Sequence, residues 1–491
     1  MKNDIRIFSQ LYIATQTRDG DLDTFFSHEN SAVPPALACN GKIRSGVKSD
    51  LLGCLKYPPT VELNINQPGL SETENESSIT APNRLNGKIL EGSVLVNMLK
   101  PPKGSTFGEY ARTLFLPKVA KELQSVSRID IVFDCYKKNS LKETARQRRG
   151  TGIRRKVEEL SQTPSNWHSF LRIDKNKTEL FSFLSEQMTS NPELNKLVIA
   201  AFEDVVLTSN QADVRNLSPC NHEEADTRVF LHALDMSNNG LQNVMIKTVD
   251  TDVVVLAVSM YAELNLKELW IEFCSGQNQV YYPIHILYNS LGPSKSRGLL
   301  FFHSLTGTDQ TSYFANCRKK SAWTTWCNFD EVTETFIKLS FTPSLEDVKD
   351  AMPVLERFVV LMYDKTSNCL DVNNCRRNLF VKKGRAMDAL PPTSAALLQH
   401  SFRAAYQAGH VWRQSLIAQQ QLPPPENWGW KKAGESYIPH WTDLGEAAIA
   451  LRELTKCSCN PEKGCSGRCK CAKAELTCTE LCKCNGDCER D

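Results

Sequence analysis

The chain has 491 residues, of which 41% are hydrophobic and 23% charged, and its formal net charge is +2. This length allows two to four domains, and the composition is ordinary for a globular protein, which excludes a wholly disordered chain. The apolar run after Asp252 is broken within about ten residues, short of the roughly 18 that a membrane span needs. The N-terminus lacks the apolar core of a signal peptide, so we expect an intracellular protein with reduced thiols.

Four regions follow one another along the chain. An N-terminal region, residues 1–86, includes the polar linker "SETENESSITAPN" at 71–83. Residues 87–335 alternate strand-like and helix-like pieces, which predicts an α/β domain with a mostly parallel sheet. A helical connector is expected over 336–445, with Thr393 as the N-cap of one helix, and a cysteine-rich module over 455–491. The expected strands are "KILEG" (88–92), "RIDIVFDCY" (128–136), "KLVIAAF" (196–202), "VMIKTVDTDVVVLAV" (244–258) and "LWIEF" (269–273).

Acidic residues recur at the ends of these elements, where an open α/β sheet binds its ligands. Asp250 and Asp252 are the most unusual, because residues two apart on a buried strand point to the same face and would bring two like charges together. The other acids follow apolar segments or begin a helix. They are Glu91, Asp134, Glu223, Glu224, Asp226 and Asp309.

Each acid also has an ordinary structural explanation. Acids in a first helical turn are favoured by the helix dipole, and a lone Asp after a strand is usually a turn or cap residue. Taken together, carboxylates from four or five elements predict one shared pocket, which is tenable only with bound cations. Oxygen ligands without a His or Cys companion favour Mg²⁺ or Mn²⁺.

In this order the acids resemble the flap-endonuclease-like branch of the PIN-domain nucleases, over residues 87–335. The motifs are Glu91, Asp134, Glu224-Ala-Asp226, Asp250-Thr-Asp252 and Gly307-Thr-Asp309. The resemblance implies a PIN-like fold and two-metal phosphodiester hydrolysis. It assigns Asp134, Glu224, Asp226 and Asp250 to one ion or to both, and Asp252 and Asp309 to the second. A divalent metal would then lie between Asp250 and Asp252.

Two departures from that family affect substrate and activity. Glu91 stands where the family has Asp, which moves the carboxylate by one methylene. After Asp309 the family has a glycine-paired helical hairpin that grips duplex DNA, whereas "QTSYFANCRKKSAW" lacks those glycines. Cys317, Arg318, Lys319 and Lys320 remain candidates for phosphate contact. The wider arrangement, with its cysteine-rich tail, also resembles a multi-copy group of animal proteins.

The segment 137–156 carries nine Lys or Arg residues and one Glu in a nearly neutral chain. Such segregated charge indicates nucleic-acid phosphate binding. A solvated basic surface or a nuclear-localisation signal is the alternative. The basic residues are Lys137, Lys138, Lys142, Arg146, Arg148, Arg149, Arg154, Arg155 and Lys156.

The tail has the spacing C-x-C-x5-C-x3-C-x-C-x6-C-x3-C-x-C-x3-C, with almost no apolar side chains for a core. An odd thiol count in a reducing compartment disfavours disulfides. Nine sulfurs supply the twelve bonds of three tetrahedral Zn²⁺ ions if three of them bridge. Nearby lysines and arginines would offset the remaining negative charge. The cysteines are Cys457, Cys459, Cys465, Cys469, Cys471, Cys478, Cys482, Cys484 and Cys488.

The tail's spacing resembles the tesmin-type CXC domain, whose relatives bind three zincs and often DNA. That family's DNA contact uses a tyrosine near the cysteines, and none occurs between Cys457 and Cys488. A structural or protein-binding zinc module, or a metallothionein-like cluster, is the alternative.

The sequence therefore predicts a nuclear, Mg²⁺- or Mn²⁺-dependent nuclease with a zinc-binding tail. Its partner would be nucleic acid, DNA rather than RNA, with chromatin proteins as further partners of the tail. Two alternatives stay open. One is a catalytically inactive nuclease fold that binds nucleic acid or chromatin, and the other is a PIN-like RNA endonuclease.

Overall fold

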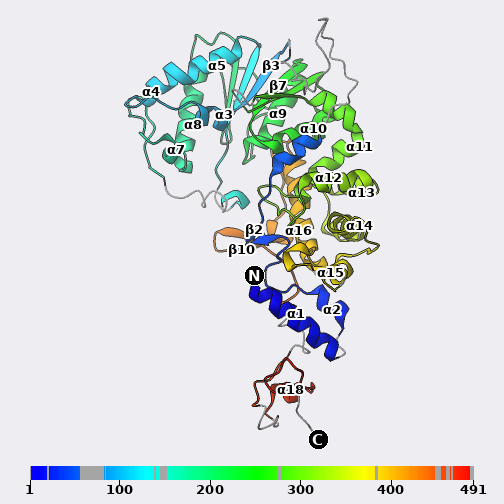
Figure 1. Ribbon diagram of the computed structural model, residues 1–491. Coiled ribbons are helices and arrows are strands. Elements are labelled where there is room, and N and C mark those ends of the chain that lie inside the picture. The colour runs from blue at the N-terminus through cyan, green and yellow to red at the C-terminus, as the bar shows by residue number, and fades with distance from the viewer. Residues whose placement is uncertain are drawn as a thin grey trace, which may run out of the picture.

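A central sheet of seven strands organises the chain (Figure 1). The computed structural model describes residues 2–18, 21–55, 82, 84–137, 140–143, 152–274, 279–381, 385–447, 455–460, 465 and 468–486. The strand order is β6-β5-β4-β3-β7-β8-β9, with the five inner strands parallel and both edge strands antiparallel. The strands are β3 (Gly87–Glu91), β4 (Arg128–Val132), β5 (Leu197–Phe202), β6 (Val205–Thr208), β7 (Asn243–Thr248), β8 (Glu268–Phe273) and β9 (Val280–Pro283).

The predicted α/β class with a mostly parallel sheet is therefore confirmed, and each of the five expected strands overlaps an observed one. The two antiparallel edge strands, β6 and β9, were not anticipated. The expected linker at 71–83 lies, apart from residue 82, outside the described residues.

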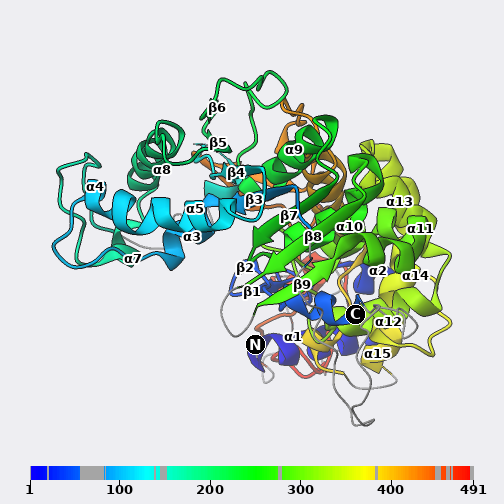
Figure 2. The same ribbon diagram turned by 90° about the horizontal axis from the view of Figure 1, so that it is seen from above.

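Helices cover both faces of the sheet (Figure 2). Ile89 and Leu90 illustrate the two layers, because successive strand residues point to opposite faces and these two join different hydrophobic cores. The core on the Leu90 side includes residues of α3 (Gly92–Met98), α4 (Phe107–Tyr110), η2 (Ala111–Phe115), α5 (Leu116–Leu123), α7 (Trp167–Phe170) and α8 (Asp174–Thr189). The core on the Ile89 side includes residues of α9 (Ala225–Asn238), α10 (Thr251–Leu264) and α11 (Ile284–Leu305).

The segment 244–258 is not one strand, as its sequence suggested. Strand β7 ends at Thr248 and helix α10 begins at Thr251, with Asp250 as its N-cap. The Asp250 carboxylate accepts a hydrogen bond from the backbone N–H of Asp252 at 2.8 Å. Because α10 is buried on nearly all sides, its sequence has no polar period that would distinguish it from a buried strand.

The Ile89-side core continues without interruption into the helices that follow the sheet. Thr393 caps α16 as predicted and accepts from the N–H of Ala396. Residues 336–445, expected to form a helical connector, also contain two antiparallel β-strands that form a hairpin. These elements are α12 (Lys319–Asn328), α13 (Val332–Ser340), α14 (Leu345–Tyr363), α15 (Val372–Val381), η4 (Met387–Ala389), α16 (Ser394–Ala405), η5 (Tyr406–Trp412), η6 (Pro425–Asn427), β10 (Trp430–Ala433) and β11 (Ser436–Pro439), with α18 (Lys470–Lys473) in the tail.

The N-terminal region packs into this same core rather than lying apart from it. Phe25, Phe26 and Leu51 are fully buried there. The buried Glu29 accepts from the N–H of Thr393 at 2.9 Å. The N-terminal elements are α1 (Lys2–Thr17), α2 (Leu22–Ser27), β1 (Ala38–Cys39), β2 (Lys42–Ile43) and η1 (Lys48–Cys54). No helix in the described ranges has the length and apolar character of a membrane span.

Candidate acidic active site

A pocket of about 430 Å³ lies where β3, β4 and β7 end. The lining brings together acids up to 218 positions apart, from Glu91 to Asp309, near the carboxyl ends of the strands. Asp252 does not line the pocket and is buried behind it. The predicted acids in the lining are Glu91, Asp134, Glu224, Asp226, Asp250 and Asp309, and Glu223 joins them.

Hydrogen bonds from the ends of neighbouring elements hold these acids in place. Asp134, just after β4, accepts from Ser93 Oγ at 2.8 Å and from the N–H of Ala225 at 3.0 Å. The first of these donors belongs to α3 and the second to α9, so one carboxylate ties two helix N-termini to the end of β4. Glu91, the last residue of β3, accepts from Thr248 Oγ1 at 2.9 Å, at the end of β7.

Burial and mutual repulsion shift the protonation of these acids. Burial, reinforced by the charge of Asp134, raises the pKa of Glu91 to about 8. Burial raises the pKa of Asp226 well above its ordinary value, and the nearby charges of Asp250 and Glu91 add to the effect. The pocket therefore holds more carboxylate than its own cations neutralise, and protons or bound cations must make up the difference.

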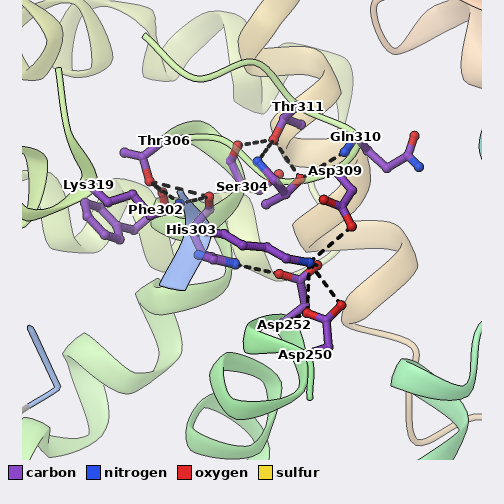
Figure 3. A network of polar contacts seen from close by, with 12 residues as sticks. Asp250, Asp252, Phe302, His303, Ser304, Thr306, Asp309, Gln310, Thr311 and Lys319 are labelled. Carbon is purple, nitrogen blue, oxygen red and sulfur yellow. Dashed lines mark hydrogen bonds and ion pairs between the residues drawn. The ribbon is translucent and has the colours of Figure 1, made fainter. Parts of the chain in front are cut away.

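Asp250 and Asp309 of the lining meet the buried Asp252, and the carboxylate oxygens of the three lie within 4.8 Å of one another; we call Asp250, Asp252 and Asp309 the three-aspartate cluster. Figure 3 shows their carboxylates pointing toward a common centre. Lys48 Nζ lies 2.9 and 3.0 Å from the two Asp250 oxygens, 3.2 Å from Asp252 Oδ2 and 3.1 Å from Asp309 Oδ2. In this structure the cation between Asp250 and Asp252 is thus an ammonium group. The metal expected there stays a prediction, although an all-oxygen donor set fits Mg²⁺ or Mn²⁺.

A second lysine enters the pocket from the basic segment. Lys142 forms an ion pair with Glu224. Burial alone would lower the pKa of the Lys142 ammonium, but the negative charges of Glu224 and Asp226 outweigh burial and raise it. Among the described basic residues of the 137–156 segment, Lys142 is therefore the one that lines the acidic pocket.

The other described basic residues of that segment lie at the surface. Lys137 donates to the carbonyl of Asn221 at 2.5 Å, Arg154 pairs with Glu179, Lys156 pairs with Glu158, and Arg155 is exposed. The remaining predicted phosphate contacts, Lys138, Arg146, Arg148 and Arg149, lie outside the described residues.

The segment after Asp309 differs from expectation in part. Cys317 and Lys319 are buried, so neither reaches a phosphate, whereas Arg318 and Lys320 are exposed. Lys319 Nζ instead donates to the carbonyl of His303 and to Thr306 Oγ1, each at 2.8 Å (Figure 3). Burial lowers the pKa of Lys319 to about 7.

Sequence reasoning missed two polar residues at the site, Lys48 and His303. His303 Nε2 lies 2.9 Å from Asp252 Oδ1. A His within "FFHSL" carries no local signal of its carboxylate partner, and Lys48 lies 202 positions before Asp250.

The tail gathers its thiols in space. Two sets of four sulfurs could each hold a metal, and both sets contain Cys457 and Cys478. Cys482 and Cys484 complete one set, and Cys465 and Cys469 complete the other. Sulfurs common to two sets are what bridging thiolates require, so the donors fit tetrahedral Zn²⁺.

The remaining cysteines lie at the margin of these sets. Cys471 Sγ is 3.6 Å from Cys482 Sγ, Cys459 packs against the cluster, and Cys488 lies outside the described residues. Arg18, after α1, reaches the cluster as well, with Nη2 3.5 Å from Cys471 Sγ.

No protein-family model matches the chain, and no curated protein matches it. Among solved structures, the D15 protein of bacteriophage T5 with metal ions is similar at 13% identity and a TM-score of 0.29, covering 67% of this chain and 96% of that one. The catalytic core of Rad2 with a DNA substrate is similar at 12% identity and a TM-score of 0.31, covering 68% and 91%.

Proposed function

We propose that this chain is a Mg²⁺- or Mn²⁺-dependent nuclease that hydrolyses phosphodiester bonds in the acidic pocket. The observation that carries the proposal is the imbalance of charge, since seven acidic side chains and two lysines line the pocket among the described residues. Burial and mutual repulsion raise the pKa of Glu91 and of Asp226, so their ionised forms are unfavourable in the pocket without a neutralising cation.

Within this proposal the acids have different roles. Asp134, Glu224 and Asp226 would hold an ion near the N-terminus of α9, with Asp250 on its other side. A bound ion of this kind activates water as a nucleophile and stabilises the leaving oxygen. Lys142, now paired with Glu224, would turn to the substrate phosphate once Glu224 binds metal.

A neighbouring pocket supports nucleic acid as the substrate. Its volume is about 370 Å³, and it shares Asp134 and Tyr136 with the acidic pocket. Exposed His168 and Arg172 lie on its wall, and the Tyr136 ring carries Lys177 Nζ at 3.8 Å from its centroid. Positive and aromatic groups beside a metal site suit a nucleic-acid strand. We favour DNA over RNA as an extension of the same proposal.

The test is cleavage of single-stranded DNA, flapped DNA and RNA by the full chain with Mn²⁺ or Mg²⁺. We expect activity that EDTA removes and that Asp134→Asn lowers by on the order of 100-fold or more. Glu158→Gln, which changes an exposed acid outside the pocket lining, is the matched control and should retain activity. Absence of cleavage of every substrate by a folded, Mn²⁺-loaded protein would reject the enzyme.

The second candidate is an inactive nuclease fold that binds nucleic acid. Lys48 favours it, because an ammonium already lies among the three aspartates. Under this candidate the chain would bind DNA in EDTA as well as in Mn²⁺, and Asp134→Asn would not alter binding.

For the tail, we propose three zinc ions in a CXC-like module, with DNA or chromatin proteins as its partners and the nucleus as its location. The shared sulfurs of Cys457 and Cys478 support the metal part of this proposal.

A further inference from the structure

Lys48 belongs to the N-terminal region, yet its ammonium lies at the centre of the three-aspartate cluster. We propose that Lys48 is a built-in cation that replaces one divalent metal in this cluster, so that the pocket binds one metal ion fewer than its carboxylates would otherwise hold. The inference rests on the proposed function and specifies its metal content.

The distances make the lysine and a metal mutually exclusive. Nζ lies 2.9 to 3.2 Å from four oxygens of the three carboxylates. A Mg²⁺ ion would lie about 2.1 Å from the same oxygens, within the volume that the ammonium fills. An ammonium has three N–H donors, and three carboxylates surround it, so its hydrogen-bonding capacity is met.

The backbone around Lys48 is fixed on both sides. Before it, the carbonyl of Arg44 accepts from the N–H of Tyr313 at 2.9 Å. Gly46 packs so closely that a Cβ there would lie 2.5 Å from the Tyr313 ring. After it, Leu51 is fully buried in the main core. Lys48 is thus held over the cluster, and a metal could enter only if the side chain rotated away from all three carboxylates.

The cluster is also held from behind. Asp252 directs Oδ1 to His303 and Oδ2 to Lys48, so the carboxylate is oriented before any metal arrives. Among the described residues, Glu91, Asp134, Glu224 and Asp226 line the pocket without contact to Lys48. With Lys48 in place, a divalent ion in the pocket would have to bind these four carboxylates instead of the three-aspartate cluster.

The experiment counts Mn²⁺ bound to the full, zinc-loaded chain by EPR titration of free Mn²⁺, in wild type and in Lys48→Met. We expect Lys48→Met to bind one Mn²⁺ more than wild type and to gain more thermal stability from Mn²⁺. Lys48→Arg should keep the wild-type count, because it retains the charge. Lys88→Met removes another partly buried lysine, the partner of Glu122, and should also leave the count unchanged.

Equal counts in wild type and Lys48→Met would overturn the inference, while cleavage of nucleic acid by wild type would leave the proposed function standing. Binding of Mn²⁺ by Lys48→Met alone would support the inference and reject metal-dependent catalysis by wild type. If Lys48→Met fails to fold, Lys48→Gln gives the same comparison with a polar side chain, and an unchanged count in it overturns the inference equally.

Discussion

His303 donates a hydrogen bond from Nε2 to Asp252 Oδ1 across 2.9 Å, and both side chains are buried. A carboxylate has only acceptors, so the histidine carries its proton on Nε2. Burial lowers the pKa of His303 to about 4, which keeps the ring neutral at physiological pH. His303 also stacks on Trp412, with the ring centroids 5.8 Å apart. The pair therefore fixes the Asp252 carboxylate from within the core.

Replacing His303 with Phe should lower the free energy of unfolding by about 1–3 kcal/mol, because it leaves a buried carboxylate oxygen without a donor. Phe retains a ring that can stack on Trp412, so the loss reports the hydrogen bond rather than packing. Urea unfolding measures the change. His303→Gln, which retains an N–H donor, should lose less, and equal losses in the two variants would contradict this explanation.

Changing both Asp250 and Asp252 to Asn should destabilise the metal-free protein, because it removes two of the three charges that neutralise Lys48. Breaking a fully buried pair costs about 3–5 kcal/mol. The Lys48 side chain is 22% exposed, so solvent screening reduces the expected loss to about 1–2 kcal/mol.

Thermal melting in EDTA measures this loss, and adding Lys48→Met to the double variant should recover much of it. A double variant that melts at or above the wild-type temperature in EDTA would show that repulsion between the carboxylates dominates. That outcome would mean that the ion pairs of Lys48 do not stabilise the metal-free protein.

His400 should make stability fall in acid. Its Nε2 lies 2.7 Å from the carbonyl of Leu305, and burial lowers its pKa to about 3. Between about pH 6.5 and 3 the unfolded chain binds a proton at this site that the folded chain does not. Stability is therefore lost as pH falls through that window, by up to about 1.4 kcal/mol per pH unit.

His400→Gln keeps an N–H donor and does not titrate. Urea unfolding of wild type and variant between pH 7 and 4 should give a shallower pH dependence for the variant. Parallel curves would mean that His400 is protonated in the folded state.

Sequence reasoning located the acids because their signal is local. Glu91 ends an apolar strand and Asp134 and Asp250 each follow one. Parallel strands end at one edge of a sheet, so the convergence of these acids could be expected before the fold was known. The first turn of α9 likewise carried Asp226 in a helix-start pattern.

The partners of those acids could not be found in the same way. Lys48 comes from a region that the sequence set apart from the sheet, and the pairing depends on the packing of Leu51 into a shared core. The start of α10 was missed because a fully buried helix and a buried strand have the same apolar sequence. Tertiary contacts, rather than local pattern, decided both features.

In the tail, the two sets of sulfurs predict unequal roles for the cysteines. Cys457 and Cys478 belong to both sets, whereas Cys469 belongs to one. Elemental analysis should give three zincs per wild-type chain, a loss of more than one zinc in Cys457→Ser, and a loss of one in Cys469→Ser. Arg18→Met should weaken zinc retention against a chelator, since the Arg18 guanidinium lies 3.5 Å from Cys471 Sγ and offsets thiolate charge. Arg215→Met, which removes an exposed arginine paired with Asp213, is the matched control and should retain zinc as wild type does. Equal zinc loss in the two cysteine variants would contradict bridging by Cys457, and one zinc or none in wild type would reject the three-zinc module itself.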